Sequence, residues 1–164
     1  MKTLYLLRHA KSSWKYIDLP DEERPLSIRG KSDAPLMGKV LANMNVQVDI
    51  IIASPAQRAK QTALEISKKL GFNKSKIVIE DLIYESGTAD LLTVIKSIND
   101  KNDFALMVGH NPGFTLLHNY LCNFHIDNIP TCGITAIKLK ISKWAELKAK
   151  CGKLLFYDYP KNHY

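Results

Sequence analysis

The sequence predicts an α/β fold, a three-layer sandwich in which helices cover both faces of a mostly parallel central sheet. Short β-branched apolar runs alternate with amphipathic helical patterns, and this alternation favours parallel strands joined by helical crossovers. The 164 residues are 46% apolar, which is enough for a core without disulfides or structural metal. Because no repeat or linker-like run interrupts the chain, we expect residues 1–164 to form one domain.

The first third of the chain contains two predicted strands and one helix. An apolar run at residues 3–7 ends at a charged pair and predicts a buried strand. An apolar stripe at residues 37–44 predicts a helix behind Pro35, which fits only in a first helical turn or at a kink. The β-branched residues 48–53 predict the second strand.

A helix over residues 56–70 has the clearest signals in the chain. Its alanines and aliphatic residues recur at helical spacing. Ser54 is the expected N-cap, Pro55 the first helical residue and Gly71 the terminator.

The rest of the chain continues the alternation. A stripe at residues 91–98 predicts a helix behind Thr88, and another helix is expected to begin at Pro112, after Asn111 as cap, and to run towards Leu121. The remaining strands are predicted at residues 77–79, 104–108, 134–141 and 153–158.

Arginine and histidine residues follow three of these strands. The first strand leads into Arg8 and His9. Arg58 lies in the first turn of the helix after the second strand, and His110 follows the strand at residues 104–108. Ligands of such sheets bind at the carboxyl ends of the strands. We therefore expect a strongly cationic pocket there.

A phosphoryl group is the ligand that this set of side chains suits. Guanidinium forks match phosphate oxygens and stay charged, and helices that begin near Pro55 and Pro112 would add backbone N–H donors. Binding alone does not need two histidines, but phosphoryl transfer needs an uncharged nucleophile near neutral pH. His9 would attack phosphorus, and His110, protonated or as a hydrogen-bond donor, would stabilise the transferring group.

Four sequence segments, taken in chain order, also carry a family resemblance. They are Leu7-Arg8-His9-Ala10, Arg24-Pro25-Leu26-Ser27-Ile28-Arg29-Gly30, Ser54-Pro55-Ala56-Gln57-Arg58-Ala59-Lys60-Gln61-Thr62-Ala63 and Gly109-His110-Asn111-Pro112-Gly113. These segments are similar to those of the histidine phosphatase superfamily and most resemble the small SixA-type phosphohistidine phosphatases, with matches over residues 3–158. The resemblance implies a phosphoglycerate mutase-like fold and a single histidine phosphatase-like domain.

The resemblance implies roles for individual side chains. His9 would be the nucleophile and His110 the second catalytic histidine, without cofactor or metal. Asn111 is a candidate for phosphate binding or for a helix cap. The candidate phosphate-binding residues are Arg8, Arg24, Arg58, His110 and Asn111.

The proton donor for the leaving group is open. Hydrolysis of an alkyl phosphate ester calls for a carboxylic acid, whereas the nitrogen of a phosphoramidate leaves more readily. Glu85 is either this catalytic acid or a surface carboxylate, and Asp18, Glu22 and Glu23 are alternatives. The choice separates a phosphohistidine phosphatase from a general phosphomonoesterase.

The predicted function is a metal-independent phosphatase that forms a phosphohistidine intermediate on His9 and acts on protein phosphohistidine. One alternative is a small-molecule phosphomonoesterase or mutase-like enzyme, and another is a phosphoryl-binding module without turnover. The expected partners are a phosphorylated protein or small phosphorylated substrate and the phosphate ion.

Charge and cysteine content bound the remaining possibilities. The net charge is +7, but only four of 23 basic residues are Arg, so we expect no nucleic-acid or membrane partner. The segment Lys138–Lys161 carries a net charge of +5. Such a segment is either a solvated face, a surface that binds an acidic protein, or a weak polyanion site. Three cysteines without a CxxC pair and no signal-peptide core favour the cytoplasm.

A zinc site is the weaker interpretation of one cluster. Four side chains of zinc-ligand type occur within 15 residues, but their spacing matches no familiar zinc pattern. Buried thiols and scaffold histidines are the alternative. The four residues are His118, Cys122, His125 and Cys132.

Overall fold

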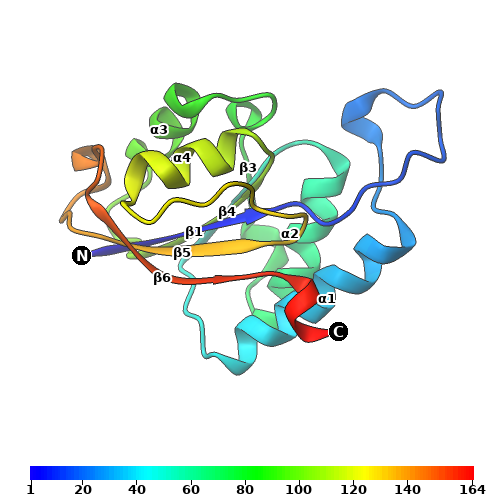
Figure 1. Ribbon diagram of the computed structural model, residues 1–164, viewed down its shortest axis with the longest axis horizontal. Coiled ribbons are helices and arrows are strands. Elements are labelled where there is room, and N and C mark those ends of the chain that lie inside the picture. Colours follow the sequence, from blue (N-terminus) through cyan, green and yellow to red (C-terminus); the bar gives the residue numbers. More distant parts are fainter.

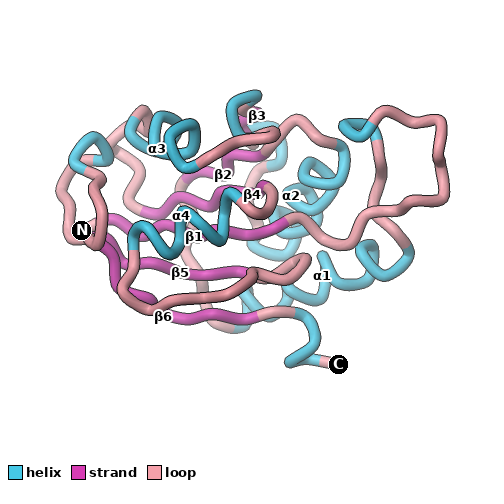
Figure 2. Tube along the Cα trace, turned by 45° about the horizontal axis from the view of Figure 1, so that its top comes forward, coloured by secondary structure: helices cyan, strands magenta, loops and turns pink.

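The computed structural model describes residues 1–164, which build a six-stranded sheet in the order β3-β2-β4-β1-β5-β6 (Figure 2). The strands β1, β2, β3 and β4 pair in parallel, whereas β5 runs antiparallel to both of its neighbours. The sheet is therefore mostly parallel, as predicted. The strands are β1 Lys2–Arg8, β2 Ile50–Ala53, β3 Val78–Ile79, β4 Phe104–Gly109, β5 Ile134–Leu139 and β6 Gly152–Asp158.

Two pairs of helices complete the three layers. Figure 1 shows α1 and α2 on one face of the sheet and α3 and α4 on the other. Met37 and Ile66 belong to the core on the first face, and Leu91 and Phe114 to the core on the second. All four side chains are withdrawn from solvent, which makes the burial of apolar area the main stabilising contribution. The helices are α1 Ile28–Asn43, α2 Gln57–Leu70, α3 Thr88–Lys96 and α4 Gly113–Leu121.

The first helix begins earlier than its apolar stripe indicates. Ser27 is its N-cap and accepts a hydrogen bond from the amide of Gly30, so α1 starts well before Pro35. Pro35 lies inside the helix, not in the first turn, and Pro has no N–H to donate there. The stripe predicted only the second half because the first two turns are largely polar.

The start of α2 also differs from the prediction. Ala56 occupies the N-cap position and the helix begins at Gln57, so neither Ser54 nor Pro55 has the predicted role. The Ser54 hydroxyl instead accepts a hydrogen bond from the Ala56 amide two residues on, which makes a turn ahead of the helix. Gly71 ends α2 in the left-handed conformation, as predicted.

The start of α4 differs by one residue. Pro112 occupies the N-cap position and the helix begins at Gly113, whereas the sequence placed Pro112 inside the helix. The Asn111 side chain still serves the helix end, because its Oδ1 accepts hydrogen bonds from the amide and hydroxyl of Thr115.

The topology brings three strand ends to one edge of the sheet. Arg8 pairs with Gly109 at the end of β1, and Ala53 pairs with Val108 at the end of β2. The connection from β1 to α1 projects over this edge in Figure 1. It contains one short 3₁₀ turn, Asp21–Glu23.

At Gly30, the first turn of α1 packs closely against the backbone of this connection. A Cβ atom on Gly30 would lie 2.1 Å from the carbonyl oxygen of Lys11, which also accepts the Ser27 amide. We expect Gly30→Ala to push this segment outwards and to lower the free energy of unfolding by about 1–3 kcal/mol. Urea unfolding measures the change, with Gly87→Ala as control because its Cβ would meet no atom within 4 Å. Equal stabilities of the two variants would contradict the close approach.

The candidate zinc ligands do not converge. The structure gathers no group of three or more His, Cys, Asp or Glu side chains that could hold a metal ion. Cys122 and Cys132 are buried in separate core clusters, and all three cysteines are unpaired. His118 bonds through Nε2 to the Phe124 carbonyl, which indicates a scaffold role.

None of the helices combines the length and the apolar character that a membrane span requires.

Candidate active site

His9 lies where β1 ends, with the side chain almost fully buried. Its Nδ1–H donates to the carbonyl of Ala10 at 2.7 Å, which leaves the lone pair on Nε2. Burial lowers the pKa of His9 to about 3, and the nearby charges of Arg8 and Arg58 act in the same direction. His9 is therefore neutral near pH 7, in the state that a nucleophile needs.

His110 lies beside His9, with the two ring centroids 5.1 Å apart. Burial first, and then the charge of Arg58, lower the pKa of His110 to about 4. Its Nε2 lies 2.7 Å from the Oγ of Ser54. The buried Ser54 hydroxyl oxygen accepts a hydrogen bond from the Ala56 amide. For the hydroxyl proton, the acceptor within reach is Nε2 of His110. We infer that neutral His110 carries its proton on Nδ1 and can donate from that atom.

Ser54 therefore acts on His110 rather than as a helix cap. We expect Ser54→Ala to lower kcat by about threefold to tenfold, because one orienting hydrogen bond is lost from the ring. Steady-state kinetics measures this change, with Ser67→Ala as the control. Ser67 is buried like Ser54, but it lies on α2 and its hydroxyl donates only to a carbonyl of the same helix. A kcat equal to that of the wild type would remove Ser54 from the site.

Arg8 presents its guanidinium next to the two histidines. Nη1 donates to the Ile129 carbonyl at 2.9 Å. Nε is buried and has no hydrogen-bond partner in the protein. A buried N–H without a partner is uncommon and costly. Arg8 is also one of the residues that line the cavity beside His9.

Arg24 comes from the β1–α1 connection and is held on every side. Nε donates to the Ser13 carbonyl at 3.2 Å, Nη1 donates to the Asp21 carboxylate at 2.9 Å, and Nη2 donates to the Ser12 hydroxyl. The Trp14 ring stacks on the guanidinium with 3.4 Å between Cζ and the ring centroid. Arg24 is thereby fixed although it lies on a long connection.

Arg58 reaches the same place from the first turn of α2. Nη1 donates to the backbone carbonyl of Asp21 at 2.7 Å, and Nη2 donates to its carboxylate at 3.0 Å. Both the Arg58 and Arg24 side chains are buried, whereas Asp21 is half-exposed. The structure thus brings Arg8, Arg24 and Arg58 together at the carboxyl edge of the sheet, with both histidines.

A cavity of about 210 Å³ opens beside His9 and the three arginines, and His110 is not among the residues that line it. Its size suits a phosphoryl group with part of its carrier, and four of its eight lining residues are Arg or Lys. The lining residues are Arg8, His9, Lys11, Ser12, Trp14, Arg24, Arg58 and Thr131.

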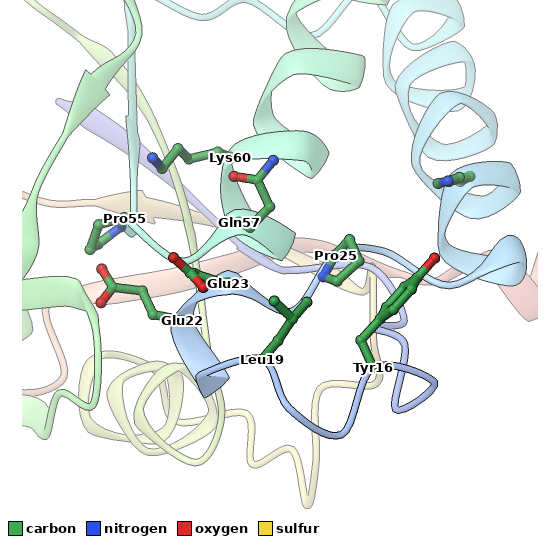
Figure 3. Close-up of a pocket in the computed structure, with 9 residues that line it drawn as sticks. Tyr16, Leu19, Glu22, Glu23, Pro25, Pro55, Gln57 and Lys60 are labelled. Carbon is green, nitrogen blue, oxygen red and sulfur yellow. The ribbon is translucent and has the colours of Figure 1, made fainter.

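A larger groove of about 830 Å³, the outer groove, is lined by Glu22 and Glu23 of the 3₁₀ turn and by seven other residues (Figure 3). Figure 3 shows the Glu22 and Glu23 side chains near Pro55 in this groove, together with Gln57 and Lys60 of α2. No histidine lines the groove, so Glu22 and Glu23 do not share the cavity of His9.

Two other sequence candidates take positions outside the cavity. Glu85 is exposed and its side chain makes no hydrogen bond in the structure. The side-chain amide of Asn111 is fully hydrogen-bonded within the protein. Its Nδ2 donates to the carbonyl of Ile129 and to Asn128, and its Oδ1 accepts from Thr115. These contacts favour the helix-cap alternative for Asn111.

Asp21 and Tyr84 contact the site residues although neither was predicted to do so from the sequence. The Tyr84 hydroxyl donates to the Asp21 carboxylate at 2.6 Å, and its ring meets that of His110 edge to face at 5.7 Å. The hydrogen bond from Tyr84, followed by those from Arg58 and Arg24, lowers the pKa of Asp21 to about 2. The one carboxylate that contacts these arginines therefore stays ionised.

The buried neutral histidines make stability pH-dependent. In the unfolded chain their pKa lies near 6.5, so below that pH the unfolded state binds more protons than the folded state. We expect the free energy of unfolding to fall as the pH drops from about 7 to about 5, above the range in which carboxylates titrate. Urea unfolding at several pH values measures this. His9→Gln should flatten the slope, and an unchanged slope in that variant would contradict the burial of neutral His9.

Comparison with known proteins decides the family. The profile of the histidine phosphatase superfamily (branch 1) matches residues 4–90, a little over half of the chain. The chain belongs to the histidine phosphatase superfamily. The matched segment includes Arg8, His9, Arg24 and Arg58 and ends before His110.

Relatives extend the similarity over nearly the whole chain. An uncharacterised chloroplastic protein of Arabidopsis thaliana is 27% identical over 159 residues, which cover 92% of this chain and 72% of the relative. A structure named SixA from Nakamurella multipartitia has a TM-score of 0.82 at 21% identity, covering 97% of this chain and 96% of that one. The histidine phosphatase SixA in complex with tungstate has a TM-score of 0.79 at 22% identity, with 98% of each chain covered. These similarities show the phosphoglycerate mutase-like fold of the superfamily.

Proposed function

We propose that this superfamily member is a phosphatase that works through a phosphoryl group on His9 and acts on phosphohistidine in proteins. The observation that carries the proposal is the neutral His9, whose Nε2 is free, beside His110 and three arginines. Such a set provides a nucleophile and fixed charges for a phosphoryl group.

The reaction has two steps. His9 Nε2 attacks phosphorus, the bond from phosphorus to the substrate nitrogen breaks, and the phosphoryl group is left on Nε2. Water then attacks phosphorus, the bond to His9 breaks, and inorganic phosphate leaves with the proton that water loses. His9 returns to its neutral form. The arginines would bind the charge on the phosphoryl oxygens, and His110 Nδ1–H would donate to one of them.

The carboxylates of the site support a nitrogen leaving group. Asp21 contacts the arginines but is held ionised, and an ionised carboxylate has no proton to give. Glu85 is exposed and Glu22 lies in the outer groove. An alkoxide needs a proton from an acid, whereas an imidazole whose other nitrogen is protonated leaves as a neutral ring. The geometry therefore favours phosphohistidine over an alkyl phosphate ester.

The test compares two substrates in the presence of a chelator. Wild type and His9→Ala are offered a phosphohistidine-bearing protein and an aromatic phosphate monoester. We expect a strong preference for phosphohistidine that is lost in the variant. Equal or better use of the monoester, also lost in the variant, would indicate a general phosphomonoesterase. Absence of turnover with either substrate would overturn the enzymatic assignment in favour of a phosphoryl-binding module.

A further inference from the structure

Asp21 connects three segments that meet at the site. Its carboxylate accepts from Arg24 of its own connection, from Arg58 of α2 and from Tyr84 of the β3–α3 connection. Its backbone carbonyl accepts a further hydrogen bond from Arg58. Two arginines and a tyrosine thus share one carboxylate.

The exposure of these groups argues against a chance surface ion pair. The side chains of Arg24 and Arg58 are 9% and 8% exposed, whereas that of Asp21 is 49% exposed. Exposed pairs contribute little, but here both cations are buried and the contact to Arg58 has two points. Asp21 therefore restricts where the buried guanidinium groups can point.

Restriction matters because Arg24 lies on the long β1–α1 connection. A donor stabilises a transition state only if it is already aimed at the developing charge, and a mobile arginine would lose entropy on each turnover. The three hydrogen bonds that the Asp21 carboxylate accepts favour its charged form and lower its pKa to about 2. Its attraction for the two arginines therefore does not vary near neutral pH.

We propose that Asp21 is a positioning residue, which acts through Arg24 and Arg58 and is itself locked by Tyr84. This inference rests on the proposed function of the same site. Asp21 itself forms no bond to the substrate. It fixes the two guanidinium groups in the orientation that the transferring phosphoryl group requires.

The test separates positioning from simple structural support. Asp21→Asn keeps the shape and one acceptor oxygen but loses the charge, and Asp21→Ala loses both. Glu22→Gln is the matched control, because Glu22 belongs to the same 3₁₀ turn but its side chain lies in the outer groove (Figure 3). Tyr84→Phe removes only the hydroxyl that donates to Asp21.

Two readouts decide the outcome. We expect Asp21→Asn to lower kcat about tenfold and Asp21→Ala to lower it further, at temperatures where both remain folded. Calorimetry should show that affinity for orthovanadate, which mimics the transition state, falls in parallel, while affinity for inorganic phosphate changes by less than about threefold. Tyr84→Phe should change both readouts in the same direction, and its effect should not add to that of Asp21→Asn.

Two results would overturn the inference. One is that Asp21→Asn behaves as Glu22→Gln does in kcat and in vanadate affinity. The other is that vanadate and phosphate affinity fall together with thermal stability, which is the pattern of structural support alone. If the wild type hydrolyses neither substrate, the proposed function fails, and the vanadate and phosphate measurements still decide the role of Asp21.

Discussion

Substitution of His9 by alanine is expected to abolish turnover while the protein remains folded. His9 is buried at a strand end, but its side chain lines the cavity and makes one hydrogen bond, to the adjacent carbonyl of Ala10. Removal of the nucleophile leaves the arginines able to bind phosphate but with no atom to accept the phosphoryl group. We expect kcat to fall by about a thousandfold or more.

The measurement needs a matched histidine and a test of folding. His125→Ala is the control, because His125 is exposed and pairs only with Asp127. It should keep the activity of the wild type. Circular dichroism and phosphate binding should show that His9→Ala is folded and retains its anion site. Turnover by His9→Ala at the rate of the control would rule out a covalent mechanism on this residue.

Loss of Arg58 is expected to have the second largest effect. Its guanidinium is fixed by two contacts to Asp21 and lies at the cavity, where it would meet the charge that develops on the phosphoryl oxygens. Removal of one such preorganised donor costs about 2–4 kcal/mol of transition-state stabilisation, so we expect Arg58→Ala to lower kcat/KM by about thirtyfold to a thousandfold.

Substitution of Arg58 by lysine shows whether the planar guanidinium or only its positive charge matters, and a second variant serves as the control. Arg58→Lys keeps the charge without the planar pair of donors, and we expect it to recover less than about a tenth of the lost activity. Arg29→Ala is the matched control, because Arg29 pairs with Asp33 on α1 and does not line the cavity. Full activity in Arg58→Lys would show that a point charge is sufficient, and full activity in Arg58→Ala would remove this arginine from the site.

The spacing of apolar residues along the sequence predicted which elements form and how they are layered, but it did not predict where the helices begin. The strand that ends at Arg8 and the one that ends at Gly109 are found as apolar runs, because both are buried on two faces. The start of α1 was missed because Ser27 caps a first turn that is polar and contains Gly30. An apolar stripe reports only the turns that face the core.

The same distinction applies to the site. Arg8, His9 and His110 could be grouped from the sequence because parallel strands end at one edge. Asp21 could not, since it stands beside two other carboxylates on the same turn and only its contacts with Arg58 and Tyr84, far away in the sequence, set it apart. The sequence signal that could have pointed to Asp21 is its place three residues before Arg24.

The central claim is that phosphorus becomes bonded to His9 during turnover. The direct measurement is rapid quenching of the enzyme with a phosphohistidine-bearing protein, followed by mapping of phosphorylated residues by mass spectrometry under alkaline conditions. We expect an acid-labile, alkali-stable phosphoryl group on His9 that is absent in His9→Ala. A phosphoryl group on another residue of the enzyme, with none on His9 at any quench time, would contradict this claim.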